Sequence, residues 1–471
     1  FYTRSMVYTM PEFLERRYNP QSRTILSVIS LVSYVLTKVA VTVYAGGLVF
    51  QQVFGIKELW GIDFFWIAAI GLVVLTALYT IFGGMKSVLY TSVLQTPILL
   101  LGSLIILVLG FKELGGWDEM MRVCGAVTVN DYGDTMTNLI RSNDDANFPW
   151  LGALIGSAII GFWYWCTDQF IVQRVLSGKN EMEARRGTIF GAYLKLLPVF
   201  LFLIPGMIAF ALHQKYIGAG GEGFLPMLAN GTANADAAFP TLVAKLLPAG
   251  VKGLVVCGIL AALMSSLASL FNSSAMLFTI DFYKRFRPET PEKKLVGIGQ
   301  VATVVIVILG ILWIPIMRSV GDVLYTYLQD VQSVLAPGIA AAFLLGICWK
   351  RTSAQGGMWG LIAGMVIGLT RLGAKVYYSN AGEVADSTFK YLFYDMNWLF
   401  FCGWMFLFCI IVVIVVSLAT KAPTAEKIQG LVFGTATKEQ KAVTRASWNH
   451  WDIIHTVIIL AITGAFYWYF W

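Results

Sequence analysis

GILAALMSSLASLFNSSAMLFTIDFY, residues 258–283, is an apolar stretch long enough to cross a membrane as one helix, and small polar side chains run along it. Those side chains recur every three or four residues, which places them on one face of the helix. They are Ala262, Ser265, Ser266, Ser269, Asn272 and Ser273. Such a face suits close helix packing, with each hydroxyl bonding the carbonyl one turn back, or it supplies oxygen ligands to a small buried cation. On this helix alone, packing is the favoured interpretation.

The composition places the whole chain among integral membrane proteins. Of its 471 residues 57% are hydrophobic and 13% charged, whereas soluble domains carry about 25% charged residues. Apolar stretches of membrane-spanning length recur from end to end. We predict eleven spans, near 22–54, 60–82, 86–111, 148–176, 187–212, 249–283, 295–317, 323–349, 355–378, 397–420 and 453–471. The gaps between them hold no soluble domain of useful size, so we predict an all-α integral membrane protein and no enzyme.

The net charge of +7 is distributed by side of the membrane rather than gathered into a nucleic-acid-binding patch. Alternate loops, beginning with residues 7–23, carry twenty lysines and arginines, and the intervening loops carry nine. Because cytoplasmic loops hold the excess of positive charge, this asymmetry predicts a cytoplasmic first loop and an outside C-terminus.

Among the charged residues in predicted spans, Lys38, Asp168 and Lys195 lie well inside theirs, and Asp330 lies about one third of the way along its own. A charge at the bilayer centre costs about 2.5–3.5 kcal/mol on insertion scales, so such residues usually face a cavity or a partner. Lys195 lies roughly 12 Å inside its span at 1.5 Å per residue, where it either faces a cavity or snorkels to the cytoplasmic edge. For Lys38 and Asp168, a structural role as the partner of an interior polar group is as well supported as a position facing a cavity.

The stretch GFWYWCTDQFIVQR, residues 161–174, puts an aromatic cluster beside an Asp–Gln pair within one span. Aromatic faces suit the apolar CH faces of a sugar ring, although an aromatic run also fits a membrane-interface belt or core packing. As a string it is more specific, because WYWCTDQ closely resembles the sodium–glucose cotransporters of the sodium/solute symporter family.

The resemblance covers almost the whole chain, in the order of that family. It is carried by YTMPEFLERRYN at 8–19, ALYTIFGGMKSVLYTSVLQT at 77–96, LMSSLASLFNSSAMLFTIDFY at 263–283 and YTYLQDVQSVLAPGIAAAFLLGICWKR at 325–351. Several independent strings in sequence make a chance match implausible.

The resemblance implies a fold and a domain organisation. The family has fourteen helices on the leucine-transporter fold, with two inverted five-helix repeats. The eleven spans would be helices 4 to 14, so that helices 1, 2 and most of 3 are missing and the chain is an N-terminally truncated single transporter domain over 1–471. Residues 22–111 would be the remainder of the first repeat, 148–349 the second repeat, and 355–471 the C-terminal helices.

The resemblance also implies a sugar site. Lys195 and Gln329 match positions that hydrogen-bond sugar hydroxyls in the family. Tyr164 and Trp165 match its inner gate, where an aromatic ring stacks under the sugar, and Tyr325 matches a further aromatic position of that gate. One departure bears on substrate choice: sugar carriers of the family usually have Asn or Thr where this chain has Gly161.

A sodium site is implied as well. Ala262, Ser265 and Ser266 match the family's sodium site, which takes one backbone carbonyl and two hydroxyls from this helix and further carbonyls from helix 2. Ser92 stands where the glucose branch has a carboxylate that helps to form a second sodium site near Ser269. We therefore expect one sodium ion per sugar.

These implications predict inward sodium flow coupled to uptake of a hexose such as glucose or galactose by alternating access, with Asp168, Ser92 and Ser269 as possible coupling residues. Sodium, the sugar and the bilayer are the expected partners, and no nucleic acid or obligate protein partner is inferred. Short outer loops poor in cysteine favour a bacterial inner-membrane protein. Two alternatives stay open: a carrier of myo-inositol, another polyol or an organic acid, and a membrane sugar sensor that signals without net transport.

Overall fold

The structure, a computed structural model, describes residues 2, 7, 9–228, 231–320, 323–381 and 385–470, without the side chains of 79, 81–89, 91–92, 94 and 318–320. These residues form two compact units. Unit 1 comprises 1–38, 143–190 and 273–458, and unit 2 comprises 39–142, 191–272 and 459–471. The predicted all-helical architecture is confirmed, because the described strands are limited to one two-stranded hairpin.

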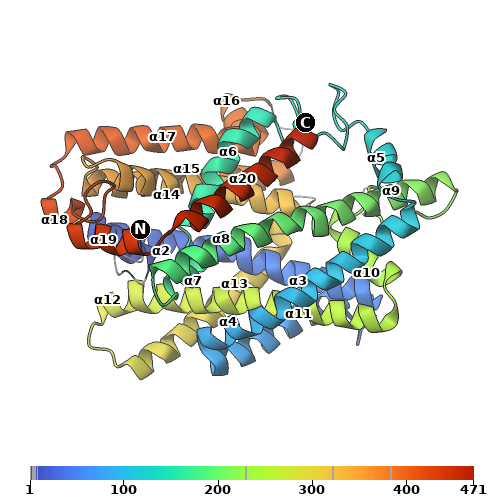
Figure 1. Ribbon diagram of the computed structural model, residues 1–471, viewed down its shortest axis with the longest axis horizontal. Coiled ribbons are helices and arrows are strands. Elements are labelled where there is room, and N and C mark those ends of the chain that lie inside the picture. Colours follow the sequence, from blue (N-terminus) through green and yellow to red (C-terminus); the bar gives the residue numbers. More distant parts are fainter. Residues whose placement is uncertain are drawn as a thin grey trace. The chain divides into compact units, whose positions relative to one another are not determined.

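Unit 1 is built from helices drawn from three separate parts of the chain (Figure 1). Its elements are α1 (Met10–Arg17), α2 (Pro20–Ser33), α6 (Trp150–Cys166), α7 (Gln169–Leu176), η5 (Leu277–Tyr283), α12 (Lys284–Phe286), α13 (Glu292–Val320), α14 (Leu324–Cys348), α15 (Ala354–Asn380), α16 (Thr388–Lys390), η6 (Tyr391–Asp395), α17 (Trp398–Ala419), α18 (Ala425–Ile428) and α19 (Lys438–Ala446).

Unit 2 and the helices divided between the units complete the chain. Unit 2 holds α3 (Ala40–Phe54), β1 (Glu58–Leu59), β2 (Ile62–Asp63), α4 (Phe64–Leu114), α5 (Trp117–Gly125), η3 (Val199–Leu203), α9 (Ile204–Gly218), η4 (Ala235–Ala237) and α10 (Ala238–Leu246). The divided helices are η2 (Tyr34–Val39), α8 (Glu181–Pro198), α11 (Ala249–Met276) and α20 (His450–Tyr469). In this scheme η2, η3, η5 and η6 are π-helical and η4 is a 3-10 helix.

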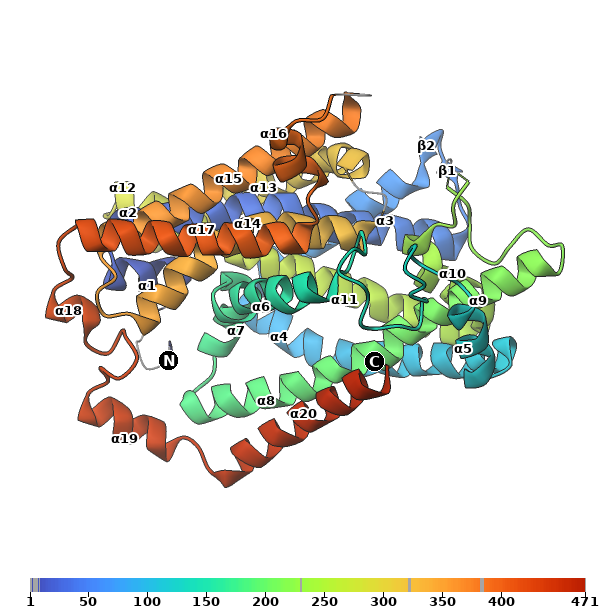
Figure 2. The same ribbon diagram turned by 90° about the horizontal axis from the view of Figure 1, so that it is seen from above.

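The centre of unit 1 is α14, which packs against α6, α15 and α17 (Figure 2). The close approach of α15 depends on a glycine at every fourth position: Gly356, Gly360, Gly364 and Gly368. A Cβ atom on Gly364 would come within 2.6 Å of the Cα atom of Gly338 on α14. Because lipid supplies no hydrophobic drive for helix association, small residues that let backbones touch are a main source of packing energy.

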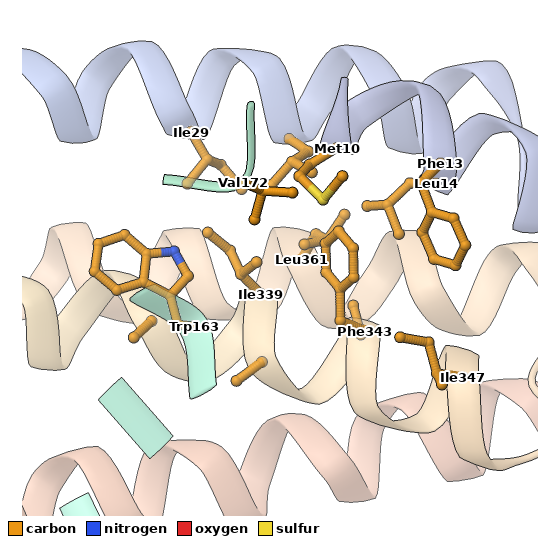
Figure 3. Packing of buried hydrophobic residues seen from close by; sticks show 14 of the residues in the cluster. Met10, Phe13, Leu14, Ile29, Trp163, Val172, Ile339, Phe343, Ile347 and Leu361 are labelled. Carbon is orange, nitrogen blue, oxygen red and sulfur yellow. The ribbon is translucent and has the colours of Figure 1, made fainter. Parts of the chain in front are cut away.

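The core of unit 1 joins α1 to the membrane helices (Figure 3). Met10, Phe13 and Leu14 of α1 are fully buried in it, beside Phe343 of α14. The rings of Phe13 and Phe343 stack with centroids 5.8 Å apart. Thr9 begins α1 by accepting a hydrogen bond from the amide of Glu12. The segment predicted as the first cytoplasmic loop is therefore a folded part of the unit.

Unit 2 has its own core around α9. Ile208, Ala209 and Leu212 are buried there, against residues of α4, α5, α10 and α11. The β1–β2 hairpin leads into α4, and the Asp63 side chain accepts a hydrogen bond from the amide of Phe65, which satisfies a free donor at the helix start.

The described residues contain nine helices long and apolar enough to cross a membrane, or ten when α6 and α7 are taken as one broken span. The difference from the predicted eleven arises at 60–111. There the two predicted spans belong to one helical element, α4. Its described residues give one span, Gln95–Leu114, and one shorter apolar helix, Phe64–Leu78, and most side chains from 79 to 94 lie outside the described residues. The glycine pair at 83–84 does not end this helix, since glycine weakens a helix by only about 1 kcal/mol.

Candidate functional site

The predicted aromatic motif lies at a break in a membrane helix. α6 ends at Cys166, α7 begins at Gln169, and their axes differ by 46°. The amides of Thr167 and Asp168 both donate to the carbonyl of Trp163, which closes α6, and the Asp168 carboxylate accepts from the amide of Phe170, which starts α7. Broken helices expose backbone groups that can bind substrates and ions at membrane depth.

Asp168 is held at this break by two side chains from η2. Its carboxylate pairs with the Lys38 ammonium group and accepts a hydrogen bond of 3.2 Å from the Tyr34 hydroxyl. The Lys38 ammonium also lies 4.3 Å from the centroid of the Phe170 ring and 5.6 Å from that of Tyr164. The structure thus brings together the two intramembrane charges Lys38 and Asp168, which relieves much of the cost of burying either one.

The aromatic residues predicted for the inner gate differ in exposure. Tyr164 is half-buried and Trp165 is 51% exposed, with their rings edge to face at 5.2 Å. Trp163, next in the chain, is buried in the core of unit 1. A Cβ atom on Gly161 would meet no atom within 4 Å, so there is room at that position for a side chain.

Gln329 and Tyr325, both predicted to contact sugar, lie one turn apart on α14. The Gln329 amide donates a hydrogen bond of 2.8 Å to the Tyr325 hydroxyl, and the Tyr325 side chain is 56% exposed. The amide oxygen and the phenol therefore present an acceptor and a donor–acceptor group side by side, which is the chemistry that polyol recognition needs.

The next residue, Asp330, is part of an ion cluster with α15. Its carboxylate pairs with the Lys375 ammonium group and lies 3.7 Å from the guanidinium of Arg371. Arg371 is fully buried, donates to the carbonyls of Leu392 and Met396, and stacks 4.0 Å from the centroid of the Phe401 ring. The cluster fixes the start of α14, and with it the backbone that carries Gln329.

The predicted sodium ligands lie on α11 in unit 2. Ser265 is 7% exposed and Ser266 is exposed, with Ala262 half-buried one turn earlier. Ser269 is fully buried on the same helix. Hydroxyl and carbonyl oxygens at this spacing are suitable ligands for a hard cation such as sodium.

Two further predicted residues need separate mention. Lys195 lies on α8 in unit 2 with an exposed side chain. Ser92 lies in α4, but its side chain is outside the described residues. The predicted residues are thus distributed over both units: the Tyr164–Trp165 and Tyr325–Gln329 pairs in unit 1, and Lys195 with the α11 residues in unit 2. Their roles stay predictions.

Sequence reasoning missed the residues that hold the predicted ones in place. Tyr34 lies in an apolar run that gives no sign of its bonds to Asp168 and Phe170. Arg371 and Lys375 are charges within the predicted span 355–378, and such charges in a membrane segment are a sequence signal for a buried partner. Gln173 was missed as well. Its side-chain amide donates a hydrogen bond to the Ser273 hydroxyl, which links α7 to the end of α11 within unit 1.

Comparison with known proteins agrees with the architecture. The sequence pattern of the sodium:solute symporter family matches residues 1–364. The chain is 35% identical to the sodium/mannose cotransporter SLC5A10 of Bos taurus, over all of the chain and 81% of that protein. It is 35% identical to the human sodium/myo-inositol cotransporter 2, over 92% of the chain, and 37% identical to sodium/glucose cotransporter 1 of Ovis aries, over 89%. The chain spans 65% of the length of each of these two relatives.

Among solved structures, the fold is similar to the substrate-bound outward-open state of a Na+-coupled sialic acid symporter. The match has a TM-score of 0.67 at 21% identity and covers 90% of this chain and 80% of the other. The predicted leucine-transporter-type fold is confirmed by this similarity.

Proposed function

Since the chain belongs to the sodium:solute symporter family, we propose that it carries a hexose of the glucose or galactose kind across a membrane together with sodium. Sodium binding favours an outward-open state, sugar binding closes the outer side, and loss of sodium to the cytoplasm opens the inner side past Tyr164. One sodium ion moves with each sugar.

One observation carries the sugar part of the proposal. Unit 1 combines an aromatic pair at a broken helix, the half-buried Tyr164 and the exposed Trp165, with the hydrogen-bonded Gln329–Tyr325 pair on α14. α6 and α14 pack directly against each other within that unit. Apolar ring faces and a convergent polar pair are the two surfaces that a sugar ring requires.

The sodium part rests on α11. Ser265 brings a hydroxyl oxygen that is almost removed from solvent, beside Ala262 and Ser266 on the same helical face. Oxygen ligands of this kind bind a hard cation without a full set of carboxylates. A weakly held neutral site suits an ion that must be released in every transport cycle.

The runner-up is a carrier of myo-inositol or a similar polyol. The relatives are named for mannose, myo-inositol and glucose. These substrates are all polyhydroxylated rings, but mannose and glucose are sugars and myo-inositol is a carbocycle. The open space at Gly161 favours this alternative, because a side chain that would narrow the choice of ring is missing there. A sugar sensor without net transport is the third candidate.

The test is uptake by the full-length protein reconstituted in phosphatidylcholine vesicles. An inward sodium gradient should drive radiolabelled galactose or glucose above its equilibrium level, and an equal choline gradient should not. Gln329→Ala should abolish or weaken this accumulation, whereas Gln300→Ala, an exposed glutamine on α13, should leave it unchanged.

The alternatives give different results in the same vesicles. Accumulation of myo-inositol but not of hexoses would replace the proposal by its runner-up. Sodium-dependent binding of sugar without accumulation would identify a sensor. Accumulation that is equal under sodium and choline would refute sodium coupling.

A further inference from the structure

Unit 1 contains a cavity where α14 and α17 end and α15 begins, and none of the described residues that line it belongs to the aromatic motif at 161–174. It has a volume of about 600 Å³, within the range of roughly 300–1,000 Å³ for small-molecule sites. The polar and charged residues that line it include Arg17, Tyr18, Ser353, Gln355, Lys421 and Lys427. These residues belong to loops that the positive-inside rule assigns to the cytoplasm.

Arg17 brings a buried positive charge to this cavity. It is 1% exposed, and its Nε and Nη2 atoms donate to the carbonyls of Gly346 and Trp349 at 2.7 and 3.2 Å. Its Nη1 atom is buried and has no hydrogen-bond partner, and no ion pair to Arg17 occurs in the part of the chain that the structure describes. A buried guanidinium without a counter-ion is costly, since both its charge and its donors need partners.

The start of α15 adds a second group that favours negative charge. Ser353 caps this 27-residue helix by accepting from the amide of Gly356 at 3.0 Å. Ala354 and Gln355, the first two helical residues, line the cavity, and their amides fall among those that have no carbonyl partner within the helix. The positive end of the helix dipole is therefore directed at the same space as Arg17.

Two lysines complete the cationic lining. Lys421 is exposed. The Lys427 ammonium group donates a hydrogen bond of 2.8 Å to the backbone carbonyl of Glu15, and this neutral acceptor does not cancel the charge of the lysine. None of the twelve described residues that line the cavity is acidic. The Ser353 and Thr420 hydroxyls, 2.6 Å apart, supply further neutral hydrogen-bonding groups.

We propose that this cavity is a binding site for a phosphate group. Arg17 and the free amides of α15 would hold the phosphate oxygens in charge-assisted hydrogen bonds, and Lys421 and Lys427 would neutralise the remaining charge. The cavity is much larger than one phosphate, so it has room for the rest of a phosphorylated molecule. The phosphate belongs either to a soluble phosphorylated compound or to the headgroup of an anionic lipid. A lipid headgroup is a candidate because the lining residues lie where membrane spans end.

The test uses the full-length protein in phosphatidylcholine nanodiscs, without sodium gradient or sugar, so that its outcome is independent of transport. Inorganic phosphate is titrated at constant ionic strength against chloride while the melting temperature is recorded. A second set of nanodiscs contains phosphatidylglycerol and no added phosphate. A saturable rise with phosphate supports a soluble source. A higher melting temperature in phosphatidylglycerol, with no further response to phosphate, supports the lipid headgroup.

Three variants locate the effect. Lys421→Gln removes an exposed charge from the cavity lining. It should raise the phosphate concentration at half-saturation by about tenfold, which corresponds to about 1.4 kcal/mol of binding free energy. Gln355→Glu places a carboxylate in the first turn of α15, where it suits the helix dipole; it should abolish the response while preserving the fold. Lys441→Gln, an exposed lysine of α19 that does not line the cavity, is the matched control and should behave as the unmodified protein.

The proposal fails if neither phosphate nor phosphatidylglycerol raises the melting temperature more than chloride does. It also fails if Lys421→Gln and Gln355→Glu both respond as the unmodified protein, because the anion then binds elsewhere.

Discussion

Breaking the Lys38–Asp168 pair one residue at a time should cost far more stability than replacing both residues. The side chains are 11% and 3% exposed, so either charge left alone would be buried without its main partner. Removing one member of a buried pair typically costs about 3–5 kcal/mol, whereas replacing both is often close to neutral. In Lys38→Met, the Asp168 carboxylate keeps the Tyr34 hydroxyl and the Phe170 amide as donors, which places this variant near 3 kcal/mol.

In Asp168→Asn the Lys38 ammonium is left facing aromatic rings, and a comparable loss is expected. The double variant Lys38→Met/Asp168→Asn should recover most of the loss, giving a coupling energy of about 2 kcal/mol or more. The assay is unfolding of the full-length protein in detergent, with the four proteins of the cycle compared under one condition. Losses that simply add, with a coupling below about 0.5 kcal/mol, would refute the reasoning.

The same cycle tests the predicted coupling role of Asp168. If its carboxylate serves only to hold the helix break, the stable double variant should keep the sodium concentration for half-maximal uptake. If the carboxylate takes part in coupling, that concentration should shift in the double variant although its stability is restored.

Four further changes have defined outcomes. Gly364→Ala should lower the free energy of unfolding by about 1–3 kcal/mol, because the new Cβ atom would clash with the backbone of α14, which has little room to move. An unchanged melting temperature would contradict this. Ser265→Ala and Ser266→Ala should each raise the sodium concentration for half-maximal uptake with little change in stability, since alanine suits a helix; identical sodium curves would remove these hydroxyls from the site. Gln329→Ala should raise the sugar concentration for half-maximal uptake roughly 5- to 150-fold, from the loss of a hydrogen-bond partner worth about 1–3 kcal/mol, and normal uptake would place the sugar elsewhere. Burial in unit 2 raises the pKa of Cys124 to about 11, so its thiol should stay protonated at pH 8 and react slowly with maleimide, with labelling faster as pH rises toward 11; rapid labelling at pH 8, followed by mass spectrometry, would show that the thiol is accessible.

The sequence predicted the class of fold, because apolar runs of span length depend on local composition, but it did not predict the break between α6 and α7. The motif WYWCTDQ was singled out for its aromatic cluster and its family resemblance, and the structure adds that α6 ends and α7 begins within it. It did not predict that α4 is continuous over the two spans assigned to 60–111, because span length alone divides this apolar stretch into two.

Partnerships between distant residues were beyond the sequence. Lys38 and Asp168 were both recognised as buried charges, but 130 positions separate them and nothing in either neighbourhood names the other. The glycines of α15 are a different case. Their four-residue spacing from Gly356 to Gly368 was readable and indicates close packing, whereas the contact of Gly364 with Gly338 required coordinates.

The ion cluster on α15 has a consequence for the order in which the protein is made. As α15 leaves the ribosome it carries Arg371 and Lys375 into the membrane, each costing about 2.5–3.5 kcal/mol if it inserts alone near the bilayer centre. Their carboxylate partner, Asp330, is on α14 and is therefore already synthesised, whereas the carbonyls of Leu392 and Met396 that Arg371 also needs come later. If α14 and α15 insert as a hairpin, Asp330 is already present to pair with both charges, but Arg371 lacks its carbonyl partners until η6 is made.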